Sequence, residues 1–276
     1  MAIVAISRGS YSKGKEVAEM VAERLGYQCV AREVIIEASR EFNIPEIKLH
    51  RAIHNAPSIL EKLTSMTYGR EKYISYFETA LLRILQKDNV VYHGFAGHFF
   101  IKDVPHALKV RIIADMEERV RLEMAREGIP REHAWRNLVK DDEERRKWSM
   151  HLYGIDTTDP NHYDLVLLIK KLSVDDAVGC ICYFAQQDTF KTTVESQKTM
   201  DDLVLAAEVK AALLNLIPDI KVQAKDGRVA LGTTLALGPL QVQELEKIAK
   251  SIAGVQSIEV KLSHLASLTG PTRIVC

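Results

Sequence analysis

The hydrophobic positions of this chain fall into short uninterrupted runs that alternate with longer stretches of helical spacing. The short runs have the pattern of strands buried on both faces of a parallel sheet, and they cover residues 3–6, 28–30, 89–92, 107–114 and 165–169. Helices are predicted between and after them, over residues 15–25, 34–42, 57–87, 116–127, 130–151 and 173–185. Strands that alternate with helices indicate an α/β fold with a doubly wound parallel sheet.

The pattern changes in the last third of the chain. Residues 186–200 are polar and rich in Thr, Gln and Lys, and they predict a connection between two domains. Beyond it, a helix, two strands joined at Asp226-Gly227, a second helix and a final strand predict a small α+β domain. We therefore expect a nucleotide-binding domain over 1–188, a linker over 189–200, the small domain over 201–266 and a tail over 267–276.

The charge balance disfavours nucleic-acid binding, although basic residues gather in one segment of the chain. Lys+Arg and Asp+Glu both total 37, so the formal net charge is zero, whereas a general nucleic-acid binder usually carries a basic surplus. Basic residues do gather between Arg126 and Lys147. We therefore expect no nucleic-acid partner but a local anionic ligand.

The four cysteines and the N-terminus bear on metal binding, disulfide formation and cellular location. The cysteines show neither zinc spacing nor a disulfide framework, and no metal site built from protein ligands is expected. The N-terminus lacks the basic and apolar regions of a signal peptide. No segment approaches the roughly 18 consecutive apolar residues of a membrane helix, so we expect a cytoplasmic protein without membrane attachment.

A phosphate-binding loop is predicted directly after the first strand. Gly9 to Lys15 fits the first seven positions of the pattern G-x-x-x-x-G-K-[ST]. In such a loop, backbone N–H groups and the start of the next helix hold an anion, and the lysine reaches the terminal phosphates. Glu16 stands at the eighth position, where a hydroxyl would hold magnesium. The alternative is an ordinary strand-to-helix turn, but the position between a buried strand and a helix favours phosphate binding.

The same residues resemble a known family. Ile6-Ser7-Arg8, the stretch from Ser12 to Ala18, and Leu25-Gly26 are similar to the opening of the cytidylate-kinase-like family, in which a glutamate follows the basic residue as Glu16 does here. Further matches follow in order along residues 1–185: Glu117-x-Arg119-Val120, Asp142-x-x-Arg145 with Trp148 three residues later, and Tyr163-Asp164-Leu165-Val166.

This resemblance implies transfer of a phosphoryl group from ATP, with Mg²⁺, to a nucleoside monophosphate such as CMP. It implies Lys15, Arg126 and Arg145 as catalytic residues, the two arginines belonging to a mobile lid. It implies phosphate or nucleotide binding by Arg8, Ser12, Lys13, Gly14, Lys15, Glu16, Arg119 and Asp142. The alternative for each arginine is a solvated helix face paired with neighbouring acidic residues.

The predicted acceptor site departs from the family pattern. Relatives often carry Gly-Arg-Gly after the third apolar run, whereas this chain has Gly94-Phe-Ala-Gly97 without an arginine. The candidates for substitute contacts near the ends of strands, where α/β sheets bind ligands, are Arg32, His93, Gly94 and His98. For the two histidines, structural hydrogen bonding and a metal pair are the alternatives. Asp115 and Asp164 are either orienters of magnesium-bound water or ordinary strand-end carboxylates.

Residues 201–266 resemble the BON domain. The matching residues are Val229-x-Leu231-Gly232 and Ile252-x-Gly254-Val255-x-x-Ile258-x-Val260. The resemblance implies a ligand-binding or regulatory module with an unidentified ligand or protein partner. Two alternatives to a kinase stay open: a nucleotide sensor without catalysis, and an envelope-associated binding protein on a kinase-like scaffold.

Overall fold

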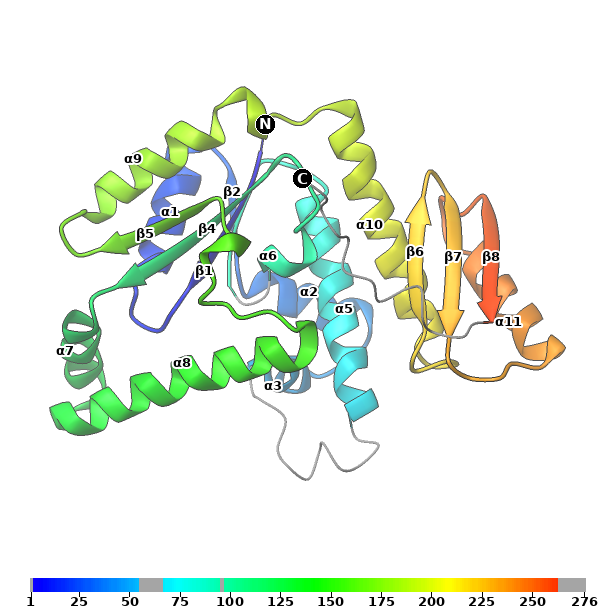
Figure 1. Cartoon of the computed structure of the whole chain (residues 1–276), viewed down its shortest axis with the longest axis horizontal. Helices are drawn as coiled ribbons and strands as arrows, with labels where there is room; N and C mark the ends of the chain where they lie inside the picture. The colour runs from blue at the N-terminus through cyan, green and yellow to red at the C-terminus, as the bar shows by residue number, and fades with distance from the viewer. Residues whose placement is uncertain (1, 55–66, 95–96, 263–276) are drawn as a thin grey trace. The chain divides into compact units, whose positions relative to one another are not determined.

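The computed structural model describes residues 2–54, 67–94 and 97–262. The chain divides into two compact units, Met1–Met200 and Asp201–Cys276, and each is described by itself (Figure 1). The tail predicted over residues 267–276 lies outside the described residues, as do Phe95 and Ala96 of the loop after the third strand.

A five-stranded sheet forms the centre of the first unit (Figure 1). Its strands are β1 (Ile3–Arg8), β2 (Gln28–Val30), β3 (Val90–His93), β4 (Ala107–Ala114) and β5 (Leu165–Ile169). All neighbours are parallel, in the order β2-β3-β1-β4-β5, which confirms the predicted parallel sheet. The chain builds outward from β1 in both directions, so the carboxyl end of β1 is the switch point where such sheets bind ligands.

Two helices cover one face of this sheet, α1 (Gly14–Leu25) and α9 (Val174–Ala185). Every second residue of β1 and β4 packs against these helices in one core, formed by Val4, Ile6, Val110, Ile112, Val17, Val21, Val178 and Ile181. The prediction of burial on both faces was wrong for β5, an edge strand whose Val166 and Leu168 are exposed. Gly26 ends α1 in a left-handed conformation with φ of 68°, and a capping box of Ser173 and Asp176 starts α9.

The helices between β2 and β5 are α2 (Glu33–Glu41), α3 (Glu46–His54), α5 (Thr67–Leu85), α6 (Gly97–Phe100), α7 (Met116–Glu127), α8 (Arg131–Tyr153) and the short η1 (Pro160–His162). The sequence pattern predicted no helix between residues 42 and 57, where α3 lies. The fully buried Trp148 of α8 fixes α3 to α8, since its indole N–H donates to the carbonyl of Ala52 at 3.1 Å.

The segment predicted as a linker is largely helical. After η2 (Asp188–Phe190), helix α10 (Val194–Leu213) begins in the first unit and ends in the second. Thr193 and Ser196 each donate a backbone N–H to the other's hydroxyl, as in a helix start. The polar residues that indicated a linker therefore also serve as helix-start signals, and only residues 191–193 are extended between η2 and α10.

The second unit contains a three-stranded sheet. Its elements after α10 are β6 (Lys221–Lys225), β7 (Arg228–Thr233), α11 (Pro239–Lys250) and β8 (Ser257–Leu262). β6 and β7 form an antiparallel hairpin through Asp226 and Gly227, whose φ angles of 50° and 76° suit a two-residue turn, and β8 adds in parallel to β7. This order of elements confirms the α+β pattern predicted from the sequence. The core is formed by Leu205, Val209, Leu213, Val229, Leu231, Leu245 and Ala249.

Candidate functional site

The loop between β1 and α1 presents a free helix N-terminus. Lys13 precedes α1 in a left-handed conformation with φ of 60°, and no side chain caps the helix. The first N–H groups of α1 are therefore available to an anion. Gly14 allows the loop to approach β1, because a Cβ at this position would lie 2.6 Å from Cβ of Arg8. Ser12 closes the turn by donating its hydroxyl to the carbonyl of Gly9 at 3.0 Å.

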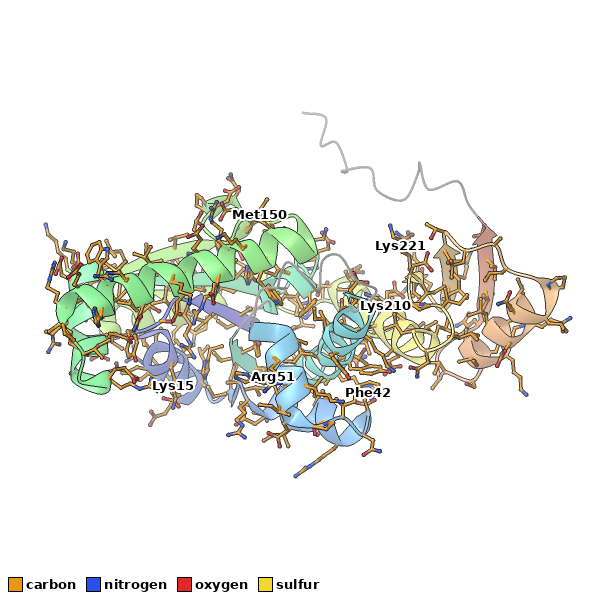
Figure 2. All side chains as sticks on the ribbon, turned by 90° about the horizontal axis from the view of Figure 1, so that it is seen from below. Lys15, Phe42, Arg51, Met150, Lys210 and Lys221 are labelled. Atoms are coloured by element: carbon orange, nitrogen blue, oxygen red, sulfur yellow. The ribbon has the colours of Figure 1, made fainter. Side chains whose placement is uncertain are left out.

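Lys15 lies one residue into α1, and its side chain is 65% exposed. Its Nζ is 3.6 Å from a carboxylate oxygen of Glu19, one helical turn further on (Figure 2 labels Lys15). An exposed pair of this kind contributes about 0.3–0.5 kcal/mol. The ammonium group can therefore exchange Glu19 for a phosphate at little cost.

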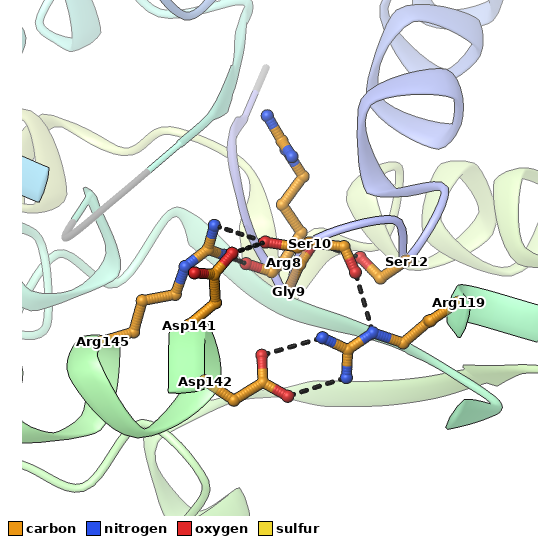
Figure 3. A network of polar contacts seen from close by, with 8 residues as sticks. All are labelled: Arg8, Gly9, Ser10, Ser12, Arg119, Asp141, Asp142 and Arg145. Atoms are coloured by element: carbon orange, nitrogen blue, oxygen red, sulfur yellow. Dashed lines mark hydrogen bonds and ion pairs between the residues drawn. The ribbon is translucent and has the colours of Figure 1, made fainter. Parts of the chain in front are cut away.

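Ser10 is the centre of a polar network that ties the loop to α7 and α8 (Figure 3). Its carbonyl accepts from Nε of Arg119 at 2.8 Å. Its hydroxyl accepts from Arg145 at 2.9 Å and donates to Asp141 at 3.2 Å. Arg145 also donates to the carbonyl of Arg8 at 3.0 Å. The loop is thus held in shape by side chains more than 100 residues away in the sequence.

Arg119 and Asp142 form a bidentate ion pair behind this loop. The two terminal nitrogens of Arg119 donate to the two carboxylate oxygens of Asp142 at 2.8 and 2.9 Å. The Arg119 side chain is 10% exposed, and its donors point to Ser10 and Asp142. Neither member of the pair lines the neighbouring cleft, and Arg119 holds the carbonyl of Ser10 in the loop.

A cleft of about 740 Å³ opens in front of the loop. It is lined by Arg8, Ser10, Tyr11, Ser12, Lys13, Gly14, Lys15, Glu16, Glu19, Leu122, Glu123, Arg126, Glu127, Asp141 and Arg145. Its volume is in the usual range of small-molecule sites, and it lies at the switch point of the sheet. The three predicted catalytic residues, Lys15, Arg126 and Arg145, therefore share one cleft.

The two predicted lid arginines differ in their surroundings. Arg126 is exposed at the end of α7, donates to the hydroxyl of Tyr11 at 3.3 Å and places its guanidinium carbon 5.8 Å from that ring. Arg145 is largely buried, and burial lowers the pKa of its guanidinium while Asp141 and Asp142 act in the opposite direction. An arginine stays protonated in this setting, so the cleft wall carries a positive charge in a partly desolvated position.

The four acceptor-site candidates have different surroundings in the structure. Arg32 is exposed and pairs with Glu46 at 3.1 Å, and it does not line the cleft. Gly94 is required by packing, because a Cβ there would lie 2.4 Å from the hydroxyl of Tyr92. His93 is buried at the end of β3, and burial followed by the charge of Arg8 lowers its pKa to about 4.

His98 belongs to a buried hydrogen-bond network and does not line the cleft. Its Nε2 lies 3.1 Å from the hydroxyl of Tyr163, which is also 3.3 Å from the hydroxyl of Ser7 and 3.0 Å from the carbonyl of Thr157. Burial lowers the pKa of His98 to about 3, so the ring is neutral. The structural alternative considered for this histidine agrees with these contacts.

The two strand-end aspartates are engaged within the protein. Asp115 caps α7 by accepting from the N–H of Glu117, and its other oxygen lies 2.6 Å from Nζ of Lys170. Asp164 accepts from the N–H of Lys109 at 2.7 Å. Within residues 2–54, 67–94 and 97–262, no group of three or more His, Cys, Asp or Glu side chains is arranged to hold a metal ion.

The second unit contains a smaller groove of about 260 Å³. Two lysines, Lys210 and Lys221, both labelled in Figure 2, line it together with Ile220, Val222, Gln223, Ala230, Leu231 and Gly232. In the part of the chain that the structure describes, no helix has the length and apolarity needed to cross a membrane.

The parallel sheet with a phosphate-type loop at its switch point defines an α/β protein of the phosphate-binding class. Residues 3–171 match the model of the cytidylate kinase-like family, and the chain belongs to this family. The match confirms the resemblance stated for the first part of the sequence. It ends before the second unit, so the BON-like part is not covered.

Two curated relatives have similar sequences over most of their length. The cytidylate kinase of Pyrobaculum aerophilum is 27% identical over 180 residues, which cover 64% of this chain and 89% of the relative. The cytidylate kinase of Staphylothermus marinus is 27% identical over 191 residues, covering 68% and 98%. The fold is similar to the crystal structure of an uncharacterized protein from Eubacterium ventriosum, with a TM-score of 0.50, 18% identity and coverage of 68% of this chain and 99% of that one.

Sequence reasoning missed Ser10 and Asp141 as members of the site. Asp141 precedes Asp142 in α8, and an acidic pair within a basic helix was interpreted only as the ion-pair partner of neighbouring arginines. Nothing local to Ser10 shows that three side chains from α7 and α8 converge on it.

Proposed function

We propose that this chain transfers a phosphoryl group from ATP to a nucleoside monophosphate with a CMP-like base. The observation that carries the proposal is the shared cleft, in which Lys15, Arg126 and Arg145 surround a loop with a free helix N-terminus. Membership of the cytidylate kinase-like family supports the same reaction class.

The chemistry asks for positioning and charge more than for covalent help. Negative charge on the migrating phosphoryl group is stabilised by cations and N–H dipoles that are already in place before reaction. In the proposed mechanism the N–H groups at the start of α1 hold the donor phosphates, and Lys15 leaves Glu19 to bind them. Arg145 stabilises the phosphoryl oxygens from the α8 side of the cleft, and Arg126 does so from α7.

Mg²⁺ fits this cleft as a partly hydrated ion. It usually keeps several waters and binds through one or two carboxylates plus substrate phosphates. Glu16 and Asp141 are carboxylates that line the cleft and would hold the ion, directly or through water. When bound, the ion neutralises part of the phosphate charge. In the described chain no three-carboxylate cluster competes for this role.

The second unit is proposed to be a BON-like regulatory module, occupying residues 201–266 after a nucleotide-binding domain of residues 1–188. The order helix, strand, strand, helix, strand supports this proposal. Its ligand or protein partner is unidentified. We place the protein in the cytoplasm, with nucleoside triphosphate and monophosphate as its small-molecule partners.

A nucleotide sensor without turnover is the second candidate. It is favoured by one specific observation, the absence of arginine from residues 94–97, where relatives often carry one for the acceptor phosphate. A BON-type interaction protein on a kinase-like scaffold would also lack turnover. Both candidates predict that no monophosphate stimulates ADP release.

A coupled assay of ADP release with CMP, dCMP, UMP and AMP tests the proposal. Stimulation by at least one acceptor is expected from the kinase, and tight ATP binding with no stimulation by any of them supports the sensor. Lys15→Ala should weaken ATP binding about tenfold to a hundredfold, as removal of a charge-assisted phosphate contact does. The matched control is Lys102→Ala, whose side chain is similarly exposed, at 68%, and does not line the cleft. An unchanged ATP affinity for a folded Lys15→Ala variant would show that the phosphate site lies elsewhere.

A further inference from the structure

The guanidinium of Arg8 has no hydrogen-bond or ion-pair partner among the described residues. Arg8 is the last residue of β1, and its backbone carbonyl accepts from Arg145, but its side chain points away from that network (Figure 3). Its Nε is buried and lacks a hydrogen-bond partner among the described residues. No carboxylate of the described chain forms an ion pair with it, although the side chain lines the cleft.

A second buried polar atom without a partner lies at the end of the neighbouring strand. His93 ends β3, which pairs with β1 so that Ile6 stands opposite His93. Nδ1 of His93 is buried and has no hydrogen-bond partner within the described chain. The charge of Arg8 acts on this imidazole, as it is one cause of the lowered pKa of His93. Two unsatisfied polar groups therefore meet where adjacent strands end.

Such an arrangement is costly for a folded protein. Burial of a charge or a polar atom without a partner costs free energy, and native proteins satisfy nearly all of these atoms. Burial lowers the pKa of Arg8, and repulsion from Arg145, the next guanidinium in the cleft wall, lowers it further. An anion in the cleft would remove the cost, and the fork of an arginine suits the oxygens of a phosphate.

The two sides of the loop differ in what they offer to such an anion. The N–H groups of α1 and Lys15 form the site already proposed for the donor phosphates, with Arg126 and Arg145 on the side of α7 and α8. Arg8 ends β1 and His93 ends the neighbouring strand β3, which precedes the loop lacking the acceptor arginine. The stem of Arg8 runs beside Gly14, and of these two residues only Arg8 lines the cleft, since His93 is buried.

We propose that Arg8, which lines the cleft, binds the phosphate monoester of the acceptor nucleotide next to the buried His93. This inference rests on the proposed kinase function for the identity of the ligand, a nucleoside monophosphate. It moves Arg8 from the donor-phosphate group, where the family resemblance placed it, to the acceptor side.

Binding measurements on the full chain test this assignment without requiring turnover. Affinities for ATP and for CMP, dCMP, UMP and AMP are measured by calorimetry for wild type, Arg8→Ala, Arg8→Lys and the exposed control Arg121→Ala. Arg8→Ala should weaken the tightest-bound monophosphate about tenfold to a hundredfold and ATP less than about threefold. Arg8→Lys should recover part of the loss, since it keeps the charge but not the fork. Arg121→Ala should change neither affinity.

His93→Asn provides an independent variant in case Arg8→Ala does not fold. It should also weaken binding of the monophosphate, and its effect should be non-additive with that of Arg8→Lys because the charge of Arg8 acts on the imidazole of His93. An equal or larger loss of ATP affinity in Arg8→Ala would return Arg8 to the donor side. Unchanged monophosphate affinity in the Arg8 variants, or no binding of any monophosphate by wild type, would overturn the assignment.

The outcomes separate this inference from the proposed function. ADP release by wild type with an unchanged acceptor KM in Arg8→Lys and His93→Asn would leave a kinase whose acceptor is held by other residues. Monophosphate binding that depends on Arg8, together with no ADP release from any acceptor, would leave the site standing and reject the kinase proposal.

Discussion

The arginines on the two sides of the phosphate loop differ in their partners. On the side of α7 and α8, Arg119 donates its two terminal nitrogens to Asp142 and its Nε to the carbonyl of Ser10. Arg145 donates to the carbonyl of Arg8 and to the hydroxyl of Ser10. On the side of β3, the Arg8 side chain has no hydrogen bond or ion pair within the described chain. An arginine with protein partners fixes geometry, whereas a buried arginine without them is kept for a ligand.

The two buried histidines repeat this difference. His98 is hydrogen-bonded to Tyr163 within a network that joins α6, β1 and the segment before β5. His93 has a buried Nδ1 without a partner among the described residues and lies beside Arg8. The partnered histidine is expected to matter for stability, and the unpartnered one for binding.

The largest effect is expected for Arg145, because this residue both holds the phosphate loop through hydrogen bonds and lines the cleft. Arg145→Ala removes a buried cation of the cleft and two bonds to the loop. Turnover should fall by about a hundredfold or more, as for other phosphoryl-stabilising cations, with a smaller change in ATP affinity. Initial rates of ADP release and calorimetry with ATP measure the two quantities. Equal losses in both would indicate that Arg145 only shapes the loop.

The next effect contrasts a partnered arginine with an unpartnered one. Arg119→Met leaves Asp142 and the carbonyl of Ser10 without their donor and should lower the free energy of unfolding by about 1–3 kcal/mol, discounted because Asp142 is partly exposed. Arg8→Met keeps the aliphatic stem and removes only an unsatisfied charge, so stability should stay within about 0.5 kcal/mol or rise. Urea unfolding of both variants measures the difference. Equal destabilisation would contradict the comparison.

The pH dependence of stability should show that His98 is neutral in the folded protein. Its folded pKa of about 3 lies below the unfolded value near 6.5, so only the unfolded state binds its proton between these values. Stability is therefore complete above pH 6.5 and falls as the solution is acidified, by up to about 1.4 kcal/mol per pH unit for one such group. Urea unfolding of wild type and His98→Gln between pH 5 and 7 should show a smaller slope for the variant. Parallel curves would mean that His98 does not stay neutral in the folded protein.

The smallest effect is expected at Lys13, which forms the left-handed turn before α1. Lys13→Gly removes a strain of about 1–2 kcal/mol but adds roughly 0.5–1 kcal/mol of chain entropy to the unfolded state. A net gain of about 0.5 kcal/mol is expected in urea unfolding. ATP affinity measured on the same variant tells whether the Lys13 ammonium contributes to phosphate binding, since the backbone of the loop is preserved.

The sequence predicted each strand of the described residues and the phosphate loop, because these features depend on residues that are close together in the sequence. A run such as Leu165–Ile169 is recognisable by its own composition, and the stop at Gly26 and the capping box at Ser173 are local signals. Helix α3 was missed because Pro45 indicates a chain break, although a short amphipathic helix begins directly after it. Packing against α2 and α5 stabilises this helix. Within the polar segment that predicts a linker, Thr193 and Ser196 begin helix α10.

The sequence by itself therefore determined the strands, most of the helices, the parallel sheet and the family, and it predicted the residues of a phosphate site. Only the tertiary structure decided which of those residues are already partnered. Ser10 and Asp141 are 131 residues apart, and Arg119 meets Asp142 only because α7 and α8 pack together. Hydrogen-bond satisfaction depends on groups brought together from the whole chain, so no local pattern could show that Arg119 is engaged while Arg8 is left for a ligand.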